Sequence, residues 1–172
     1  MYAIRCTKKL LDRGAPKTQA PEITTTTVLG DWYANILIER PEHLVVCVSE
    51  RTLLPVIVPA KDLKRLPSRL AAAAAEMLKA IGVQDQDVAE EFAAMQETYF
   101  AKTSDRRVLG SLNDFVFHVQ NGTASHHEFT LHERSLRLAQ MPCAVLNYAY
   151  PSESALAAFA ASKALKAAKS AA

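Results

Sequence analysis

Three short apolar segments near the middle of the chain restrict its fold more than any other feature. They run from Tyr33 to Glu39, from Leu44 to Ser49 and from Leu53 to Val58, with the short connections 40–43 and 50–52 between them. Segments of this length, rich in β-branched residues and separated by polar connections, are typical of consecutive antiparallel strands. We therefore predict a three-stranded meander.

The residues of the meander also indicate how it is covered. The run Leu44–Val48 is almost entirely apolar, which predicts that both faces of the middle strand are buried. Pro55 has no N–H to donate, so the third strand should lie at an edge of the sheet or carry a bulge. Apolar residues at helical spacing predict covering helices at 69–81, 85–97 and 106–119.

Two further segments complete the expected fold. Alternation over Tyr2–Cys6 predicts a first strand, and the β-forming run Tyr99–Thr103 predicts another. The fold class is therefore α+β, with a mainly antiparallel sheet of four or five strands covered by helices, and the strand order stays open. Residues 1–150 are expected to form one domain, and residues 151–172, rich in alanine and lysine, a helical tail.

Unusual polar chemistry is concentrated where the run 99–103 meets the helix at 106–119. Ser104 or Asp105 is the expected N-cap, because either side chain can accept from the first N–H groups of the helix. Arg106 and Arg107 then occupy the first turn, where the helix dipole disfavours cations. An anion bound there, such as a phosphate or a carboxylate, would account for them.

The alternative is that both arginines pair with carboxylates of the protein itself. Glu50, Glu97 and Asp114 are the candidates for these pairs. Gly110 lies inside the same helix, where glycine costs about 1 kcal/mol relative to alanine. It therefore suggests the close approach of another backbone or of a ligand.

The junction belongs to a set of four ordered motifs. They are Arg5–Leu11, Leu29–Asn35, Ser49–Val56 and Lys102–Phe115. With these motifs the chain resembles, over most of residues 1–145, an uncharacterised family of short bacterial proteins described as a domain of unknown function. The resemblance brings no activity, cofactor or catalytic residue with it.

The amino-acid composition limits which cellular compartment and which class of partner we expect. The chain has 172 residues with 20 basic and 18 acidic side chains, a formal charge of +2, which by itself does not argue for nucleic-acid binding. Cys6, Cys47 and Cys143 are odd in number and widely spaced, as expected of reduced thiols in the cytosol. No segment is apolar enough over the length of a membrane span, so we expect a cytoplasmic protein without membrane contact.

The sequence contains no recognisable cofactor or metal motif. Glycine-rich loops of the nucleotide-binding types are absent, so no cofactor is expected. His127-Glu128 followed by His132 is one residue longer than the zinc-protease motif, and this spacing places the histidines on different helix faces. We therefore expect no metal site.

The function with the best support is a non-enzymatic binding module for an anionic partner, either nucleic-acid backbone or protein. Its expected ligand-binding residues are Arg5, Lys102, Ser104, Arg106, Arg107 and Asn113, with Lys8 nearby. The alternative is an enzyme acting on a phosphorylated or carboxylated small molecule, with Glu50 or Asp114 as acid or base. A structural or oligomeric protein, including a homodimer, is a third interpretation.

Overall fold

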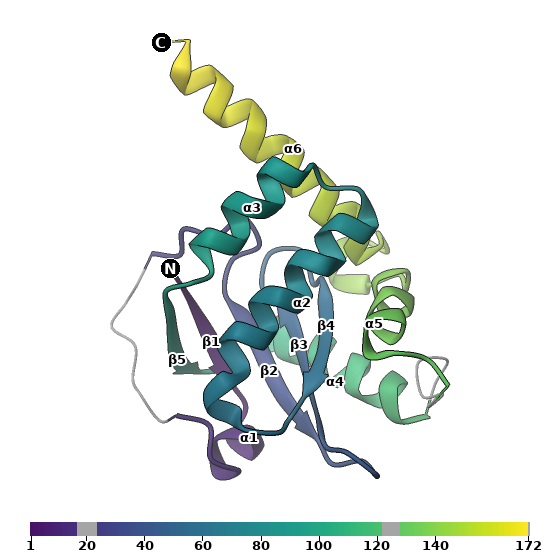
Figure 1. Ribbon diagram of the computed structural model, residues 1–172. Coiled ribbons are helices and arrows are strands. Elements are labelled where there is room, and N and C mark those ends of the chain that lie inside the picture. The colour runs from purple at the N-terminus through teal and green to yellow at the C-terminus, as the bar shows by residue number, and fades with distance from the viewer. Residues whose placement is uncertain (17–23, 122–127, 172) are drawn as a thin grey trace.

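The computed structural model describes residues 1–16, 24–121 and 128–171 (Figure 1). Within these ranges five strands form one sheet in the order β4-β3-β2-β1-β5. The strands are β1 Tyr2–Cys6, β2 Trp32–Leu37, β3 Leu44–Ser49, β4 Pro55–Pro59 and β5 Thr98–Lys102. The helices are α1 Lys8–Asp12, α2 Leu66–Ile81, α3 Asp85–Ala94, α4 Arg106–Asn121, α5 Leu131–Ala139 and α6 Pro151–Ser170, with short 3₁₀ turns at Leu63–Arg65 and Ala144–Leu146.

The predicted meander is confirmed as β2, β3 and β4. Its strands pair antiparallel, with Tyr33 opposite Val48 and Val48 opposite Pro55. Pro55 is the first residue of β4, which lies at an edge of the sheet, a position where a residue without an N–H is tolerated. The edge of β4 that pairs with no other strand of the described chain lies against α5. There the Ser135 hydroxyl of α5 accepts a hydrogen bond from the Ile57 N–H at 2.9 Å.

The α+β fold class is confirmed, but the sheet is mixed and not mainly antiparallel. β1 lies between β2 and β5 and runs parallel to both. The connection from β1 to β2 contains α1, and the connection from β4 to β5 contains α2 and α3. Crossovers of this length permit parallel pairing, which short hairpin connections do not.

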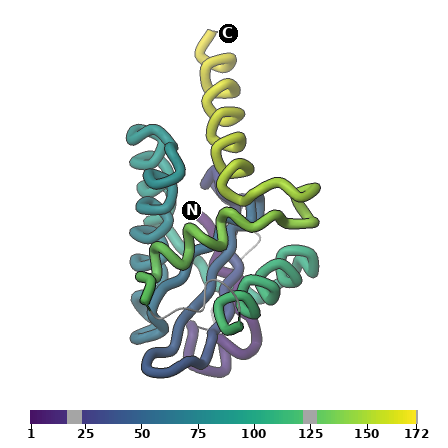
Figure 2. Tube along the Cα trace, turned by 90° about the vertical axis from the view of Figure 1, so that its right-hand side faces the viewer, coloured from purple at the N-terminus to yellow at the C-terminus, as the bar shows by residue number. Residues whose placement is uncertain are grey.

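Helices cover both faces of the sheet and create two apolar clusters. α2 covers one face and α4 the other, as Figure 2 shows with the sheet between them. α4 buries Val108, Leu112, Phe115 and Val119, the spacing that predicted the helix. Every residue of β3 is buried, as its continuous apolar run requires.

The remaining predictions have mixed outcomes. The tail is helical from Pro151 to Ser170; Ala155 and Phe159 pack into the cluster under α2, while the end of α6 projects from the body (Figure 1). The close approach predicted at Gly110 is wrong for the described part of the protein, where no atom beyond α4's own backbone and the adjacent residues lies within 4 Å of the place where a Cβ would be. His127 lies outside the described residues.

No helix in the described part of the chain is both long enough and apolar enough to cross a membrane.

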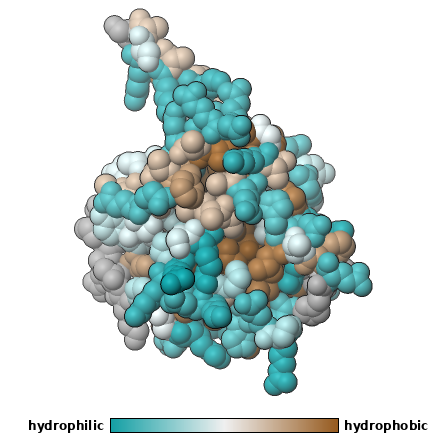
Figure 3. Space-filling view, in the orientation of Figure 1, coloured by the Kyte–Doolittle hydropathy of each residue, from teal (hydrophilic) through white to brown (hydrophobic). Residues whose placement is uncertain are grey.

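Figure 3 shows a band of apolar residues in the gap between α2 and α5, and mostly hydrophilic residues at the lower end of the same face. Val56, Ile57 and Val58 of β4 line this gap.

Candidate functional site

The carboxyl ends of β1 and β5 lie side by side at one end of the sheet. Cys6 and Lys102, the last residues of these strands, are paired in the parallel register. After β1 the chain enters α1, whose Leu10 packs on the α2 face, and after β5 it enters α4, which packs on the opposite face. Connections that leave neighbouring parallel strands toward opposite faces define a topological switch point, the usual place of ligand sites in open α/β sheets.

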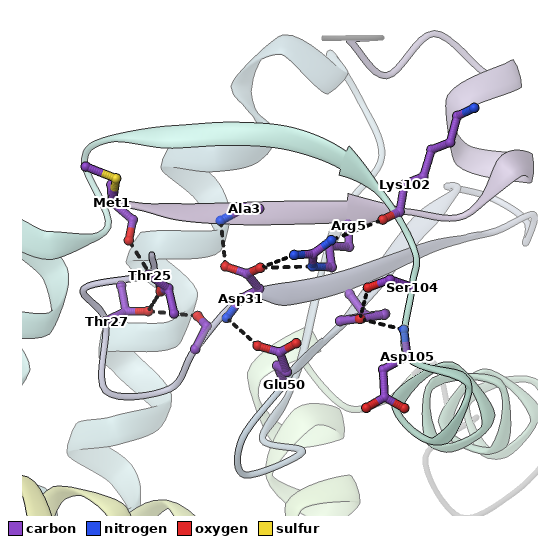
Figure 4. Close-up of polar contacts among 12 residues, drawn as sticks. Met1, Ala3, Arg5, Thr25, Thr27, Asp31, Glu50, Lys102, Ser104 and Asp105 are labelled. Atoms are coloured by element: carbon purple, nitrogen blue, oxygen red, sulfur yellow. Dashed lines mark hydrogen bonds and ion pairs between the residues drawn. The ribbon is translucent and has the colours of Figure 1, made fainter. Parts of the chain in front are cut away.

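Arg5 and Asp31 form the ion pair beside this switch point. Arg5 Nε and Nη2 lie 2.9 and 2.8 Å from Asp31 Oδ2, and the Ala3 N–H donates to Asp31 Oδ1 at 2.9 Å. The Asp31 side chain is 5% exposed and that of Arg5 25% exposed. Arg5 Nη1 also lies 3.5 Å from the Lys102 carbonyl oxygen, so the guanidinium of this β1 residue contacts both the residue that precedes β2 and the end of β5 (Figure 4).

Glu50 lies on the other side of Asp31. The Asp31 N–H points at Glu50 Oε2 over 3.5 Å, and the Glu50 N–H donates to the Asp31 carbonyl at 2.8 Å. Gly30 has a φ of +82°, and a Cβ there would lie 2.9 Å from Arg51 Cγ and 3.3 Å from Glu50 Oε2. Glycine is therefore needed for the turn and for the close packing of the connection between β3 and β4 over it.

The segment that leads to Asp31 is held by α3. Glu91, only 3% exposed, accepts hydrogen bonds from the N–H groups of Val28 and Leu29 at 2.7 and 3.0 Å. Burial raises the pKa of Glu91, although these two hydrogen bonds and the nearby Arg51 act against the shift. Arg51 donates to the carbonyls of Thr27 and Val28, so charged side chains from two elements fix this segment.

The junction between β5 and α4 is fixed by Tyr33. Its hydroxyl accepts from the Asp105 N–H at 3.0 Å and lies 3.1 Å from Ser104 Oγ. Asp105 is the N-cap, since its Oδ1 accepts from the Arg107 N–H at 2.8 Å and its carbonyl from the Leu109 N–H. The prediction of Ser104 or Asp105 as the cap is therefore confirmed for Asp105.

The two arginines of the first turn differ in their surroundings. Arg107 pairs with Asp105 at 3.2 Å and not with Glu50, Glu97 or Asp114, so the expected partners are wrong for this residue. This contact lowers the pKa of Asp105, first through the side-chain hydrogen bond from Arg107. Arg106 is exposed and makes no side-chain hydrogen bond or ion pair within the described residues.

Two further predicted residues lie at this end of the sheet. The Lys102 side chain is exposed and points away from Arg5 and Asp31 (Figure 4), with no side-chain partner among the described residues. Asn113 of α4 lies 3.5 Å from the Asn35 amide nitrogen through its Oδ1, and Asn35 Oδ1 accepts from the Thr7 hydroxyl at 2.8 Å. Asn35 therefore connects α4 to the end of β1.

Asp114 does not join the group formed by Arg5, Asp31 and Glu50. Burial, and then the charge of Asp114, raises the pKa of the Cys143 thiol to about 11, so this carboxylate lies near Cys143. No hydrogen bond within the described residues links it to Arg5, Asp31 or Glu50. Across the described ranges, no group of three His, Cys, Asp or Glu side chains is placed to hold a metal ion.

Tyr33 and Asn35 were not among the predicted site residues. Both lie on β2 within the motif Leu29–Asn35, whose alternation places them on the face that α4 partly covers. Their membership of a motif was the only signal in the sequence, because neither residue type indicates a role by itself. Glu91 was also missed, since its partners lie more than 60 residues away in the sequence.

Segments from all four motifs meet around this site. A model of a domain of unknown function, DUF6933, matches residues 3–154. The chain belongs to the DUF6933 family. No curated protein and no solved structure gives a significant match. The DUF6933 match includes every site residue named above and ends in the first turn of α6.

Proposed function

We propose that this DUF6933 chain is a non-enzymatic binding module for an anionic partner, with Lys102 and Arg106 as the primary contacts. The observation that carries the proposal is the presence, beside the switch point of β1 and β5, of two exposed cations that have no carboxylate partner among the described residues. An unpaired cation keeps its full charge available for a partner, whereas Arg107 is already engaged by Asp105.

Secondary contacts follow from the same geometry. Lys8 is exposed in the first turn of α1, which follows β1 at the same end of the sheet. The Ser104 hydroxyl and the Asn113 amide offer polar groups, while Arg5 is held by Asp31 and serves to keep the strand ends in place. The Asp105 carboxylate occupies the Arg107 N–H, so recognition relies on the cationic side chains more than on the backbone of α4.

Salt-dependent binding tests the proposal with two anionic probes, a fluorescent single-stranded oligonucleotide and polyglutamate. Oligonucleotide affinity should fall with salt at a slope of about −0.7 per neutralised phosphate. The double variant Lys102→Ala/Arg106→Ala should therefore reduce the slope by about 1.4. Preference for one probe would identify nucleic-acid backbone or protein as the partner.

A matched control removes the same charge elsewhere. Lys79, near the end of α2, and Lys169, near the end of α6, are both exposed. Lys79→Ala/Lys169→Ala should leave affinity and slope nearly unchanged. The proposal is wrong if neither probe binds, or if both double variants lose affinity equally, because net charge alone would then explain the binding.

The alternative is an enzyme acting on a phosphorylated or carboxylated small molecule. The observation that favours it is the partly buried Arg5–Asp31 pair with Glu50 beside it. Glu50→Gln would abolish turnover under this alternative and leave the binding of both probes unchanged under the first. Asp114→Asn tests the second predicted acid in the same way. Bacterial origin, a cytosolic location and a homodimer stay predictions.

A further inference from the structure

A second concave surface lies between three connections at the lower end of the molecule. They are the end of α1 at Arg13–Gly14, the turn between β2 and β3 at Pro41–His43, and the segment Ala60–Lys64 that leads into α2 (Figure 1). We call this surface the three-loop hollow; its volume is about 570 Å³. That size is within the range of small-molecule sites, about 300–1,000 Å³.

The floor of the three-loop hollow is apolar. Ile36 of β2 is 3% exposed and belongs to the cluster under α2, and Ala60 and Leu63 pack against the same cluster. The Ala60 N–H donates to the His43 carbonyl at 2.8 Å, which joins two of the three connections. A floor continuous with the main core is fixed before a ligand arrives, which lowers the entropy cost of binding.

The rim carries an excess of unpaired cations. Arg13, Lys61 and Lys64 line the hollow and are exposed, and their side chains have no hydrogen bond or ion pair within the described residues. Two carboxylates, Glu42 and Asp62, also line it. Asp62 is engaged by Arg65 Nε at 3.4 Å, so three cations face one unengaged carboxylate.

His43 adds a directional polar group. Its Nδ1 lies 3.0 Å from the Glu39 carbonyl oxygen, which can only accept, so Nδ1 must carry the proton. In the neutral ring Nε2 is then the acceptor, available to a ligand hydroxyl or amide. The hollow therefore combines an apolar floor, cations on the rim and one oriented hydrogen-bonding group.

We propose that the three-loop hollow is a binding site for a small organic anion. The apolar body of this ligand lies on Ile36 and Leu63, and its carboxylate or phosphate group contacts Arg13, Lys61 and Lys64. Neither Lys102 nor Arg106 lines the hollow, so the proposal stands independently of the anionic partner assigned to the switch point.

Phenyl phosphate and inorganic phosphate are the probes for this site, added separately to the isotope-labelled full chain. Amide resonances of Gly14, Ala60 and Lys61 should shift and saturate with phenyl phosphate. Its affinity should exceed that of inorganic phosphate about tenfold, because the ring buries apolar surface against the floor. Lys61→Ala/Lys64→Ala should weaken phenyl phosphate about fivefold or more.

The control is again Lys79→Ala/Lys169→Ala, which should change phenyl phosphate affinity by less than about twofold. Equal affinity for the two probes would overturn the assignment of an organic ligand, and unshifted resonances at the three connections would overturn the site itself. An unaltered affinity in Lys61→Ala/Lys64→Ala would overturn the role of the rim. Lys102→Ala/Arg106→Ala should retain phenyl phosphate binding, so failure at the switch point does not imply failure here.

Discussion

Asp31 holds Arg5 through a single carboxylate oxygen, with Nε and Nη2 at 2.9 and 2.8 Å, while its other oxygen accepts from the Ala3 N–H. One side chain immediately before β2 thus fixes both the backbone and the charged side chain of β1. Parallel pairing of these strands has no hairpin to set its register, and the three contacts of Asp31 supply part of that constraint.

Asp31→Asn should destabilise the protein by about 2 kcal/mol, because the partly buried Arg5 guanidinium loses its counter-charge. Urea denaturation measures the change. Arg107→Ala is the matched control, since it removes an exposed ion pair that leaves the Asp105 cap in place, and its denaturation midpoint should stay near that of the wild type. Equal midpoints for the Asp31 variant and the wild type would show that the pair contributes nothing.

Gly30→Ala should cost about 1–3 kcal/mol, because the position requires a positive φ and the new Cβ would press on the Arg51 side chain. Gly110→Ala should instead stabilise the chain by about 0.5–1 kcal/mol, since α4 is regular there and the space is open. Thermal denaturation of the two variants gives the comparison. A stabilising Gly30 variant would contradict the assigned turn, and a destabilising Gly110 variant would contradict the open space beside α4.

Glu91 should make the folded protein less stable as pH rises. Burial raises its folded-state pKa above the ordinary value of 4.5, so the folded state binds the proton more tightly than the unfolded state. Stability linked to this proton is present below pH 4.5 and is lost as pH rises through the folded-state pKa. Asp105 and Glu133, whose pKa values are lowered, change stability with pH in the opposite direction.

Comparison with the variant Glu91→Gln isolates the contribution of Glu91 to the pH dependence of stability. The free energy of unfolding of both proteins is measured in urea from pH 4.5 to 8. As pH rises, the value for the wild type should fall relative to the value for Glu91→Gln. Asp105 and Glu133 are common to both proteins and cancel. A difference that is constant, or that moves in favour of the wild type, would mean that burial does not raise this pKa.

Local sequence determined most of the elements. Short segments rich in β-branched residues, separated by short polar connections, predicted β2, β3 and β4, while apolar periodicity predicted α2 and α4 to within three residues at each end. The cap at Asp105 also followed from sequence, because capping depends on the two or three residues that follow. Pro55 restricted β4 to an edge position or a bulge, because its missing N–H limits ladder bonding, and the structure has the edge position.

Only the tertiary structure decided how these elements are joined. The parallel placement of β1 between β2 and β5 depends on pairings such as Ile4 with Phe100, which no local pattern encodes. For the same reason the partner of Arg107, the Tyr33 contact with the start of α4, and the separation of Asp114 from Glu50 were not predictable. Local interactions select secondary structure, whereas contacts between distant segments form only when the whole core is buried, and such contacts placed the Arg5 side chain of β1 beside the Lys102 carbonyl at the end of β5.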